Sequence, residues 1–459
     1  MTDKKQDLID PRLQNLNDDG VDRRGFLKCM AWAGTGLVWT MSGGIPVSRA
    51  FAKDNGKDAG IAADFSFVQI SDSHIGFNKP ANPDVTATLQ VAINKINAMT
   101  RKPDFIIHTG DLSQLSKPSE FDTLDQALKA ASAKQIYFVP GEHDMLSDNG
   151  DEYLQRFGKG TKGTGYYSFD HKGVHLVGLV NVANLKAGGM GSLGQEQLEW
   201  LENDLKGRSA STPIVLFAHI PLWTIYPDWG WGTDDSEQAL SYVKRFGSVT
   251  VLNGHIHQIM QKVEGKVSFH TAMSTAFPQP APGAAPSAGP MKVPADQLRR
   301  VLGIRDVNYV VSGRSLAVVD SPLSDSETAA SENQIKKGNK TMTRKNVWFA
   351  SLATPVVIAM LLLFAGSPRV TANDQPPAAN AVKIDNFVFG PQTITVPVGT
   401  TVTWTNSDDI PHTAVSTDGV FKSKVMDTDE KFSYTFTKAG TYSYFCSIHP
   451  KMTGQVVVK

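Results

Sequence analysis

The residues best suited to chemistry form clusters of Asp, His and Glu, and each cluster follows a short apolar run. The run "FSFVQI" leads into "SDSH", "DFIIHT" into "GD", "IYFVP" into "GEHD", "PIVLFA" into His219, and "VTVLN" into "GHIH". Carboxylate and imidazole groups together suit iron, manganese or zinc. The clusters supply Asp72, His74, Asp111, Glu142, His143, Asp144, His219, His255 and His257.

The apolar runs predict buried strands, and amphipathic stretches between them predict helices. "SEFDTLDQALKAAS" predicts a helix capped by Ser119, and "QLEWLENDLKG" predicts one that closes at Gly207. Strands that alternate with helices indicate a layered α/β domain, in which ligands collect beyond the carboxyl ends of the strands. One such cluster alone would be weak evidence, but five clusters at strand ends predict a metal centre.

The order D-x-H, G-D, G-x-H-D, H, G-H-x-H resembles the calcineurin-like metallophosphoesterases over residues 63–320. This resemblance implies an α/β sandwich of sheets flanked by helices, with two metal ions. It also assigns roles: Asp72, His74 and His257 hold one metal, Asp111 bridges, and Glu142, His219 and His255 hold the second with Asp111. His143 would protonate the leaving group, and Asp144 would orient the His143 ring.

A pair of divalent or trivalent ions (Fe, Mn or Zn) can clamp phosphate oxygens and generate a bridging hydroxide, so we expect hydrolysis of a small phosphoester, most readily a phosphodiester. Glu142 stands where the family usually has Asn. We expect Glu142 still to bind metal and its extra charge to favour a ferric ion, with a less acidic bridging water as the cost. The same substitution leaves open a weak or non-catalytic site.

Residues 381–459 alternate apolar and polar side chains between Gly turns, which predicts an all-β sandwich. Its last turn, "CSIHPKM", contains Cys446, His449 and Met452, and "DIPHTAV" supplies His412. One thiolate, two imidazoles and a thioether are the ligands of type 1 copper. A bound copper ion would also explain why Cys446 need not pair with another cysteine.

This segment resembles the plastocyanin-like cupredoxins, and its short ligand loop is closest to that of amicyanin. The resemblance implies a Greek-key sandwich, one copper ion and single-electron transfer to a redox partner protein through the His449 edge. Copper carriage is the second interpretation.

Two further loops have open interpretations. Trp223, Tyr226, Trp229 and Trp231 follow His219 and either stack on a substrate or pack their own loop. The Pro-rich stretch 277–294 predicts an extended surface loop. Four other histidines on or near strands are interpreted as structural: His108, His171, His175 and His270.

The N-terminus carries "DRRGFLK", a mild apolar run and "SRAFA". This pattern predicts a twin-arginine export signal over residues 1–52 and a periplasmic location. Cys29 would be removed with the signal.

A second signal-like stretch, residues 342–372, lies in the middle of the chain after an expected disordered linker, 321–341. Residues 347–365 are almost wholly apolar, so a membrane span or anchor and a second cleaved signal are both considered. Basic residues before the stretch would place the upstream flank in the cytoplasm, which contradicts export of the first domain. We therefore favour two exported proteins, each with its own signal, joined in one chain.

The chain has 45 basic and 45 acidic residues, so its charges balance. This balance argues against a general polyanion binder, and we expect no nucleic-acid partner. Two functional hypotheses follow. The first is an exported binuclear phosphoesterase joined to a copper electron-transfer domain. The second is a non-catalytic redox or copper-carrying protein with a degenerate phosphoesterase domain.

Overall fold

The computed structural model describes residues 36–42, 45–51, 65–310, 315–324 and 380–459. The twin-arginine pair, Cys29 and the apolar stretch 342–372 lie outside these residues. Within the first two ranges, β1 (Gly36–Ser42) pairs antiparallel with β2 (Ile45–Phe51). No helix among the described residues has the length and apolar character to cross a bilayer.

The larger domain contains two sheets. The first has the order β13-β12-β3-β4-β5 and the second the order β10-β11-β9-β8-β7-β6. The first sheet consists of β3 (Phe65–Ile70), β4 (Phe105–His108), β5 (Ile136–Phe138), β12 (Gly303–Val310) and β13 (Ser315–Pro322). The second consists of β6 (Tyr167–His171), β7 (Val174–Gly178), β8 (Ile214–Ala218), β9 (Val249–Asn253), β10 (Gln261–Glu264) and β11 (Val267–Thr271).

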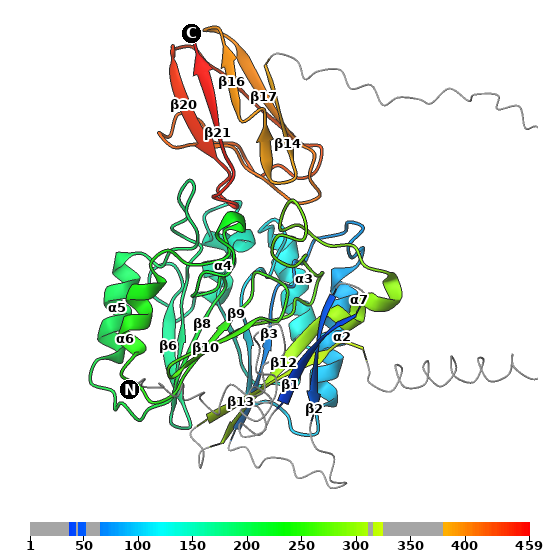
Figure 1. The fold of residues 1–459 in the computed structure, drawn as a ribbon, viewed down its shortest axis with the longest axis vertical. Coiled ribbons are helices and arrows are strands. Elements are labelled where there is room, and N and C mark those ends of the chain that lie inside the picture. The colour runs from blue at the N-terminus through cyan, green and yellow to red at the C-terminus, as the bar shows by residue number, and fades with distance from the viewer. Residues whose placement is uncertain (1–35, 43–44, 52–64, 311–314, 325–379) are drawn as a thin grey trace, which may run out of the picture.

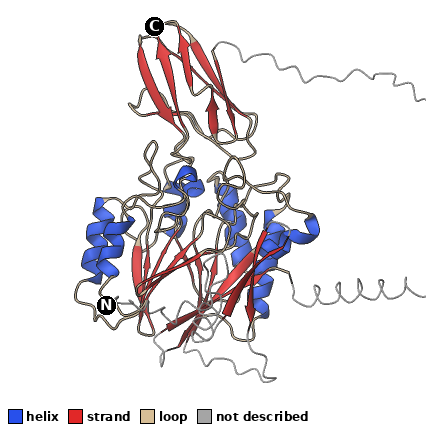
Figure 2. Cartoon of the chain, viewed as in Figure 1, coloured by secondary structure: helices blue, strands red, loops and turns tan. Residues whose placement is uncertain are grey.

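Helices cover the outer faces of both sheets (Figure 2). Apolar side chains of β3 and β4 pack on α2 and α3, and those of β8 and β9 pack on α5 and α6. A third core, which includes Phe67, Phe217 and Leu252, fills the space between the sheets. The predicted layered α/β sandwich is confirmed. The helices are α2 (Val85–Ala98), α3 (Pro118–Leu128), η2 (Glu142–Met145), α4 (Asp151–Phe157), α5 (Gln195–Leu205), η3 (Pro227–Trp229), α6 (Ser236–Val243) and α7 (Ala295–Val301).

Two predicted boundaries need correction. Helix α3 begins at Pro118 with Lys117 as its N-cap, so Ser119 lies inside the first turn, because proline is favoured at the first helical position. The domain also continues past residue 320, since β13 runs to Pro322 and Leu323 is buried in the core. The predicted end of α5 at Gly207 is close to the observed one. The helix ends at Leu205, and Gly207 has φ +84°.

All five apolar runs that precede the acidic and histidine clusters are strands, but they belong to different sheets. The first three form β3, β4 and β5, and the last two form β8 and β9. Within each group neighbouring strands are parallel. Their carboxyl ends therefore lie at one edge of the double sheet, where the loops carry the candidate ligands.

The C-terminal domain is a sandwich of two four-stranded sheets, in the orders β15-β14-β17-β19 and β16-β21-β20-β18. Trp404, Tyr444 and Val456 are among the side chains that fill its core. The predicted cupredoxin fold is confirmed. Its strands are β14 (Ala381–Asp385), β15 (Val388–Gly390), β16 (Thr393–Val396), β17 (Thr401–Asn406), β18 (Val415–Ser416), β19 (Lys431–Thr435), β20 (Gly440–Phe445) and β21 (Thr453–Val458).

The sandwich stands on the loops at the ligand-bearing edge of the larger domain, with the C-terminus at its far end (Figure 1). The amide of Gly188 donates to the carbonyl of Pro450, and Lys422 Nζ donates to Asn149 Oδ1 over 3.3 Å. Lys79 Nζ lies 3.8 Å from Asp427 Oδ1. The turn that carries the predicted copper ligands therefore faces the loops that carry the other predicted metal ligands.

Candidate metal centres

Seven side chains from four loops and a 3-10 helix converge at the sheet edge. Their ligand atoms form overlapping groups that lie within 4.8 Å of one another. One group is Asp72, His74 and His257, a second is Glu142, His219 and His255, and a third, Asp72, Asp111 and His219, joins them. A fourth group, His74, Asp111 and His143, also includes the predicted general acid. The first two groups contain the same residues as the two predicted ligand sets, and Asp111 lies between them.

The imidazole Nε2 atoms of three histidines point at the carboxylates. His257 Nε2 lies 3.4 Å from Asp72 Oδ1, and His74 Nε2 lies 3.4 Å from Asp111 Oδ2. His219 Nε2 lies 3.3 Å from the same Asp111 oxygen. Asp111 therefore faces one histidine from each set, as a bridging ligand must.

Backbone and amide carbonyls orient these rings from behind. His219 Nδ1 donates to the Thr109 carbonyl over 2.7 Å, and His257 Nδ1 donates to the Phe277 carbonyl over 2.6 Å. His74 Nδ1 lies 3.0 Å from Gln114 Oε1. A hydrogen bond at Nδ1 leaves Nε2 free to bind metal, which is the usual arrangement around ligating histidines.

Glu142 occupies the position where the resemblance predicts a ligand to the second metal. One of its oxygens lies 2.9 Å from His255 Nδ1, and the other lies 3.1 Å from His219 Nε2. Burial raises the pKa of this carboxyl, but charge and hydrogen bonding from His255 and His219 lower it by more. The pKa of Glu142 is therefore well below its usual range. The side chain is therefore held as a carboxylate facing the predicted second metal.

The backbone is strained at five of the predicted ligands. Asp72, His74, Asp111, His255 and His257 all have φ between +42° and +70°, a region that non-glycine residues rarely adopt. Such strain costs roughly 1–3 kcal/mol per residue and concentrates at functional sites. Packing at the sheet edge therefore holds these side chains in positions that their own backbones disfavour.

Two glycines leave room for the site. A Cβ on Gly141 would lie 2.0 Å from Asp111 Oδ1, and a Cβ on Gly110 would lie 2.4 Å from His219 Nδ1. Gly110 also has φ +96°. The glycine of the G-D motif and that of the G-E-H-D motif are thus required by close approach to the ligands.

The predicted contact between Asp144 and the His143 ring is wrong. His143 Nδ1 donates to the Gln114 carbonyl over 2.8 Å, so the backbone of Gln114 orients this ring. Asp144 instead accepts hydrogen bonds from the amides of Leu112, Ser113 and Gly141. Burial and the nearby Asp111 raise the pKa of Asp144 to about 7. The carboxyl ties together the loops that carry Asp111 and Glu142, which makes it a structural group.

The residues present fit a pair of cations. Among the predicted ligands, four buried atoms lack a hydrogen bond of good geometry, although three of them face one another across the Glu142 contacts: Asp72 Oδ2, Glu142 Oε2, His219 Nε2 and His255 Nδ1. His74 Nε2 and His257 Nε2 lie only 3.2 Å apart. Buried polar atoms normally find partners, and these all belong to oxygen and imidazole donors that suit iron, manganese or zinc. Their roles as individual ligands stay predictions.

The second centre lies in the small domain. Cys446 Sγ is 3.7 Å from His412 Nδ1 and 3.7 Å from His449 Nδ1, and the two Nδ1 atoms are 3.2 Å apart. Met452, the predicted axial ligand, is buried in the same turn, and its carbonyl accepts from the Cys446 amide over 3.0 Å. The donor set and the cluster fit one copper ion.

Neighbouring groups prepare this thiol for metal binding. Burial raises the pKa of Cys446, but hydrogen bonding and charge from His412 and His449 outweigh it, so the net pKa is well below normal. The Thr413 amide donates to Cys446 Sγ over 3.4 Å. His412 Nε2 donates to Asp408 Oδ2 over 2.8 Å, which fixes the ring with Nδ1 toward the sulfur.

The four histidines interpreted as structural lie on strands, and only His108 borders the predicted ligands, through Ser73 between Asp72 and His74. His108 on β4 pairs through Nε2 with Ser73 Oγ at 2.8 Å, and His175 on β7 lies between Asp170 and Asp204. His171 is on β6 and His270 on β11. None of the four is in a group of described residues able to hold a metal ion.

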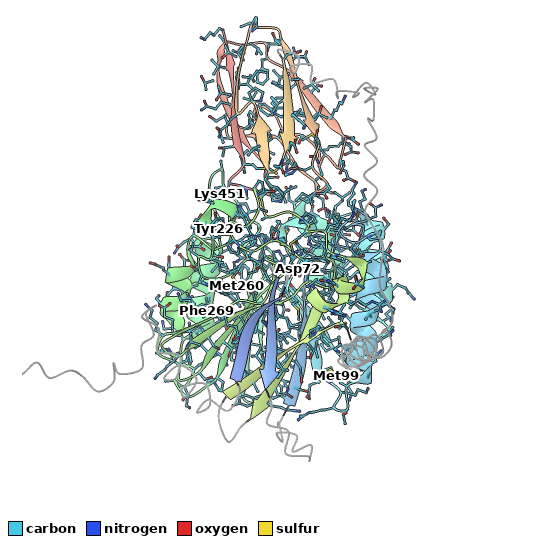
Figure 3. All side chains as sticks on the ribbon, turned by 45° about the vertical axis from the view of Figure 1, so that its right-hand side comes forward. Asp72, Met99, Tyr226, Met260, Phe269 and Lys451 are labelled. Atoms are coloured by element: carbon cyan, nitrogen blue, oxygen red, sulfur yellow. The ribbon has the colours of Figure 1, made fainter. Side chains whose placement is uncertain are left out.

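The aromatic loop after His219 divides between the two interpretations. Trp223 packs on Phe269 in the core, with ring centres 5.1 Å apart. Trp229 and Trp231 line a cavity of about 230 Å³ that also reaches Asp111, Glu142 and other predicted ligands. Figure 3 places Lys451, a further lining residue, at the junction of the two domains.

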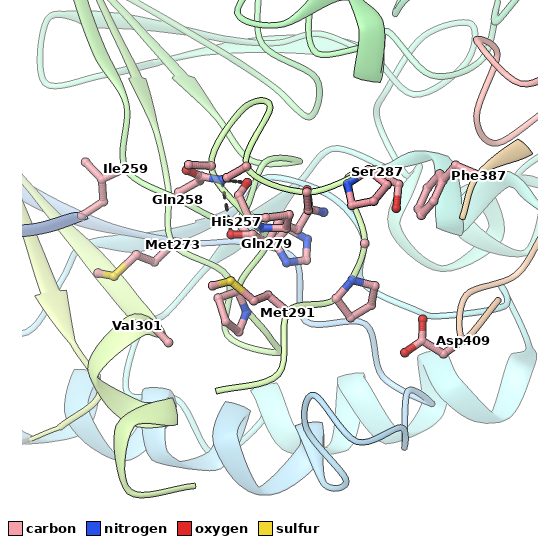
Figure 4. Close-up of a pocket in the computed structure, with 18 of the residues that line it drawn as sticks. His257, Gln258, Ile259, Met273, Gln279, Ser287, Met291, Val301, Phe387 and Asp409 are labelled. Atoms are coloured by element: carbon pink, nitrogen blue, oxygen red, sulfur yellow. Dashed lines mark hydrogen bonds between the residues drawn. The ribbon is translucent and has the colours of Figure 1, made fainter. Parts of the chain in front are cut away.

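A larger cavity of about 430 Å³ lies beside the Pro-rich loop 277–294, near His257 and Met273 (Figure 4). Gln258 Nε2 donates to the Pro280 carbonyl over 2.7 Å, which fastens this loop. Of the predicted metal ligands this cavity touches only His257, so the smaller cavity is the better candidate for the reacting groups.

Sequence reasoning missed Gln114 and Phe387. Gln114 contacts both His74 and His143, and Phe387 packs its ring 4.6 Å from that of His449. Neither residue belongs to a ligand motif, and no signal in the sequence singles them out.

Comparison with known proteins identifies a family for each of the two domains. The calcineurin-like phosphoesterase family matches residues 65–259, and the cupredoxin-like domain family matches residues 355–458. Amicyanin of Paracoccus denitrificans is 35% identical over 24% of this chain and 92% of that protein. A probable glycerophosphodiester phosphodiesterase GpdQ of Arcobacter nitrofigilis is 25% identical over 45% of the chain and 77% of that protein. The serine/threonine-protein phosphatase CPPED1 of Danio rerio is 28% identical over 42% and 70%.

Proposed function

Because this chain joins a calcineurin-like phosphoesterase domain to a cupredoxin domain of the amicyanin family, we propose that it hydrolyses a small phosphodiester at a binuclear metal site and exchanges single electrons at a type 1 copper site. The larger domain is that of a metal-dependent phosphoric ester hydrolase. The observation that carries the proposal is the convergence of Asp72, Asp111 and Glu142 with four histidines at one sheet edge.

The metal ions would be held by Asp72, His74 and His257 on one side and by Glu142, His219 and His255 on the other, with Asp111 between them. When bound, the pair would polarise the phosphoryl group and supply an activated water. Three carboxylates favour a highly charged pair, so we propose that iron is among the native metals.

We infer that His143 acts as the general acid. The Gln114 carbonyl holds its Nδ1 proton, which leaves Nε2 to donate a proton to the departing oxygen. Its ring lies edge to face with that of His74, with centres 4.7 Å apart, and lines the same cavity as Asp111 and Glu142. Asp111 Oδ1 accepts the His143 amide over 3.0 Å, which couples the acid to the bridging carboxylate.

The full chain, loaded with manganese or iron, should hydrolyse bis(4-nitrophenyl) phosphate. His143→Gln should lower kcat by about 10²- to 10⁴-fold with little change in metal content. His171→Gln, in a histidine outside the site, is the matched control. Absence of turnover with every metal would instead favour the non-catalytic, degenerate interpretation.

The copper function is proposed from His412, Cys446, His449 and Met452. Cupric ion added to the full chain should produce an intense blue colour, and Cys446→Ser should abolish it. A redox partner protein is expected, and copper carriage without electron transfer is the alternative. A chain that binds copper but cannot be reversibly reduced would favour carriage.

Export through the twin-arginine pathway belongs to the proposal and rests on the sequence of residues 1–52. Cleavage after Ala372 would separate two exported proteins, whereas an uncut segment 347–365 would anchor the chain to a membrane. Mass spectrometry of the native protein distinguishes them, because a single uncut species past both domains rules out processing.

A further inference from the structure

The cavity of about 230 Å³ is built by both domains. The larger domain supplies a floor of carboxylates and imidazoles, among them Asp111, Glu142 and His143, and one wall through Trp229 and Trp231. The small domain supplies the opposite side through Phe387, Ile448, His449, Lys451 and Met452. The predicted substrate site is therefore incomplete without the copper domain.

His449 belongs to both centres. Its Nδ1 atom faces Cys446 Sγ at 3.7 Å, while its ring lies 6.5 Å from the ring of His143, at an angle of 69°. Phe387 packs on the same ring, with centres 4.6 Å apart. A ligand that fills the cavity would therefore contact the immediate surroundings of the copper site.

The contacts that hold the copper domain here are spread over the rim. The backbone contact from Gly188 to Pro450 lies beside the cavity, and Lys422 reaches Asn149 on the larger domain. Ile410 packs into the core of the larger domain, and Leu146 packs against the core of the smaller one. These polar and apolar contacts fix the position of the copper domain on the larger domain.

The lining indicates what the cavity would accept. Its walls include the flat or apolar side chains Trp229, Trp231, Phe277, Phe387 and Ile448, whereas its floor carries the predicted metal ligands. Among the described lining residues, Lys451 is the only lysine or arginine. The volume falls below the roughly 300–1,000 Å³ of sites for drug-sized ligands, so the occupant is small.

We propose that the copper-binding turn and Phe387 complete the substrate pocket of the phosphoesterase. The substrate is a small phosphoester with one aromatic or apolar substituent, held between the tryptophans and Phe387, with Lys451 attracting its negative charge. Because His449 is shared, occupation of the pocket and the state of the copper site are coupled, and the coupling acts in both directions. This inference rests on the proposed phosphoesterase function.

The first test uses the full chain loaded with copper and with zinc, which has no visible spectrum of its own. Phenyl phosphate and inorganic phosphate are titrated while the blue copper absorption is recorded. We expect a saturable change in the band, at lower concentration for phenyl phosphate than for inorganic phosphate. A band that stays unchanged at saturating phenyl phosphate overturns the coupling. Because this readout needs no turnover, it tests pocket occupation even if hydrolysis is never observed.

The second test uses kinetics of an aryl phosphodiester with the same protein. Phe387→Ala should raise KM by about tenfold, and Phe387→Leu should restore most of the affinity. Lys451→Gln should raise KM by about two- to fivefold with kcat unchanged. Lys438→Gln, on the same domain away from the cavity, is the control. If both Phe387→Ala and Lys451→Gln are active and keep the parental KM, the small domain does not form part of the substrate pocket. The proposed phosphoesterase function would remain intact.

Discussion

The ring of His449 meets the ring of His143 at a centre-to-centre distance of 6.5 Å, across the boundary between two domains of different fold. His449 is a predicted copper ligand, and His143 is the predicted general acid of the phosphoesterase. The ring of Phe387 packs against His449, and the ring of His74 packs against His143. The two predicted metal centres are thus separated by a few side chains.

Replacing Glu142 tests why a carboxylate stands where related sites use an amide. Glu142→Asn removes the charge and shortens the side chain, so its contacts with His219 and His255 should weaken. We expect the variant to retain less iron relative to zinc or manganese and to shift its pH optimum downward. Metal analysis together with a pH–rate profile measures both.

Glu142→Gln, which keeps the length and removes only the charge, separates the two effects. Unchanged metal content and unchanged hydrolysis in Glu142→Asn would contradict the idea that Glu142 selects the metal pair.

Gly141→Ala tests the packing of the bridging carboxylate. The added Cβ would lie 2.0 Å from Asp111 Oδ1 and 2.5 Å from the Asp111 amide, so Asp111 must move. A displacement of this kind should lower metal affinity or hydrolysis by about 10- to 100-fold. Metal titration and steady-state kinetics measure the loss.

Gly247→Ala is the matched control, because its Cβ would meet only the Ala210 carbonyl at 3.7 Å. Parental activity in Gly141→Ala would show that the loop can yield without cost to the site.

Asp408→Asn tests the group behind the copper ligand. Asp408 accepts from His412 Nε2 over 2.8 Å and from the Phe387 amide over 3.0 Å. Both bonds end on Oδ2, so an amide oxygen in that position can keep them. The amide nitrogen in place of Oδ1 cannot accept from the Asn386 amide, and a neutral amide cannot balance charge on the His412 ring. Copper affinity should therefore fall by about tenfold or more.

Competition with a chelator measures this affinity, and Asp418→Asn, at an exposed carboxylate that accepts the Val420 amide, is the control. If both variants bind copper with equal affinity, Asp408 does not support the predicted copper site.

The sequence alone was sufficient to predict the two folds and the five strands that precede the candidate ligands. Each cluster such as "SDSH" or "GHIH" follows a buried run, and burial on both faces gives a continuous apolar signature that is hard to mistake. The pairing of those strands was less accessible, because β5 and β8 join different sheets through contacts between residues distant in sequence.

Three features of the site could not be predicted from local patterns. The positive φ values of Asp72 and His255 are imposed by packing against the rest of the domain, which overrides local preference. The role of Asp144 depends on which amides surround it, and three of them come from two loops. The approach of His449 to His143 depends on how the two domains pack together, which no local sequence pattern describes.

His108→Gln tests a buried histidine through the pH dependence of stability. His108 is fully buried, and burial lowers its pKa to about 4 from 6.5, although Asp72 opposes the shift. Between these pH values the unfolded chain binds more protons than the folded one, so the free energy of unfolding falls as pH decreases from 6.5 to 4. This histidine alone accounts for up to roughly 3 kcal/mol of that loss.

Gln cannot take up a proton in this range but can still bond Ser73 Oγ. Urea denaturation at pH 7.5 and pH 5.0 should therefore show a smaller drop in stability for His108→Gln than for the parent. His171→Gln, on the neighbouring sheet, controls for loss of any imidazole. If the parent and His108→Gln lose the same free energy of unfolding over this interval, His108 takes up its proton without cost in the folded protein, and its burial does not keep it neutral.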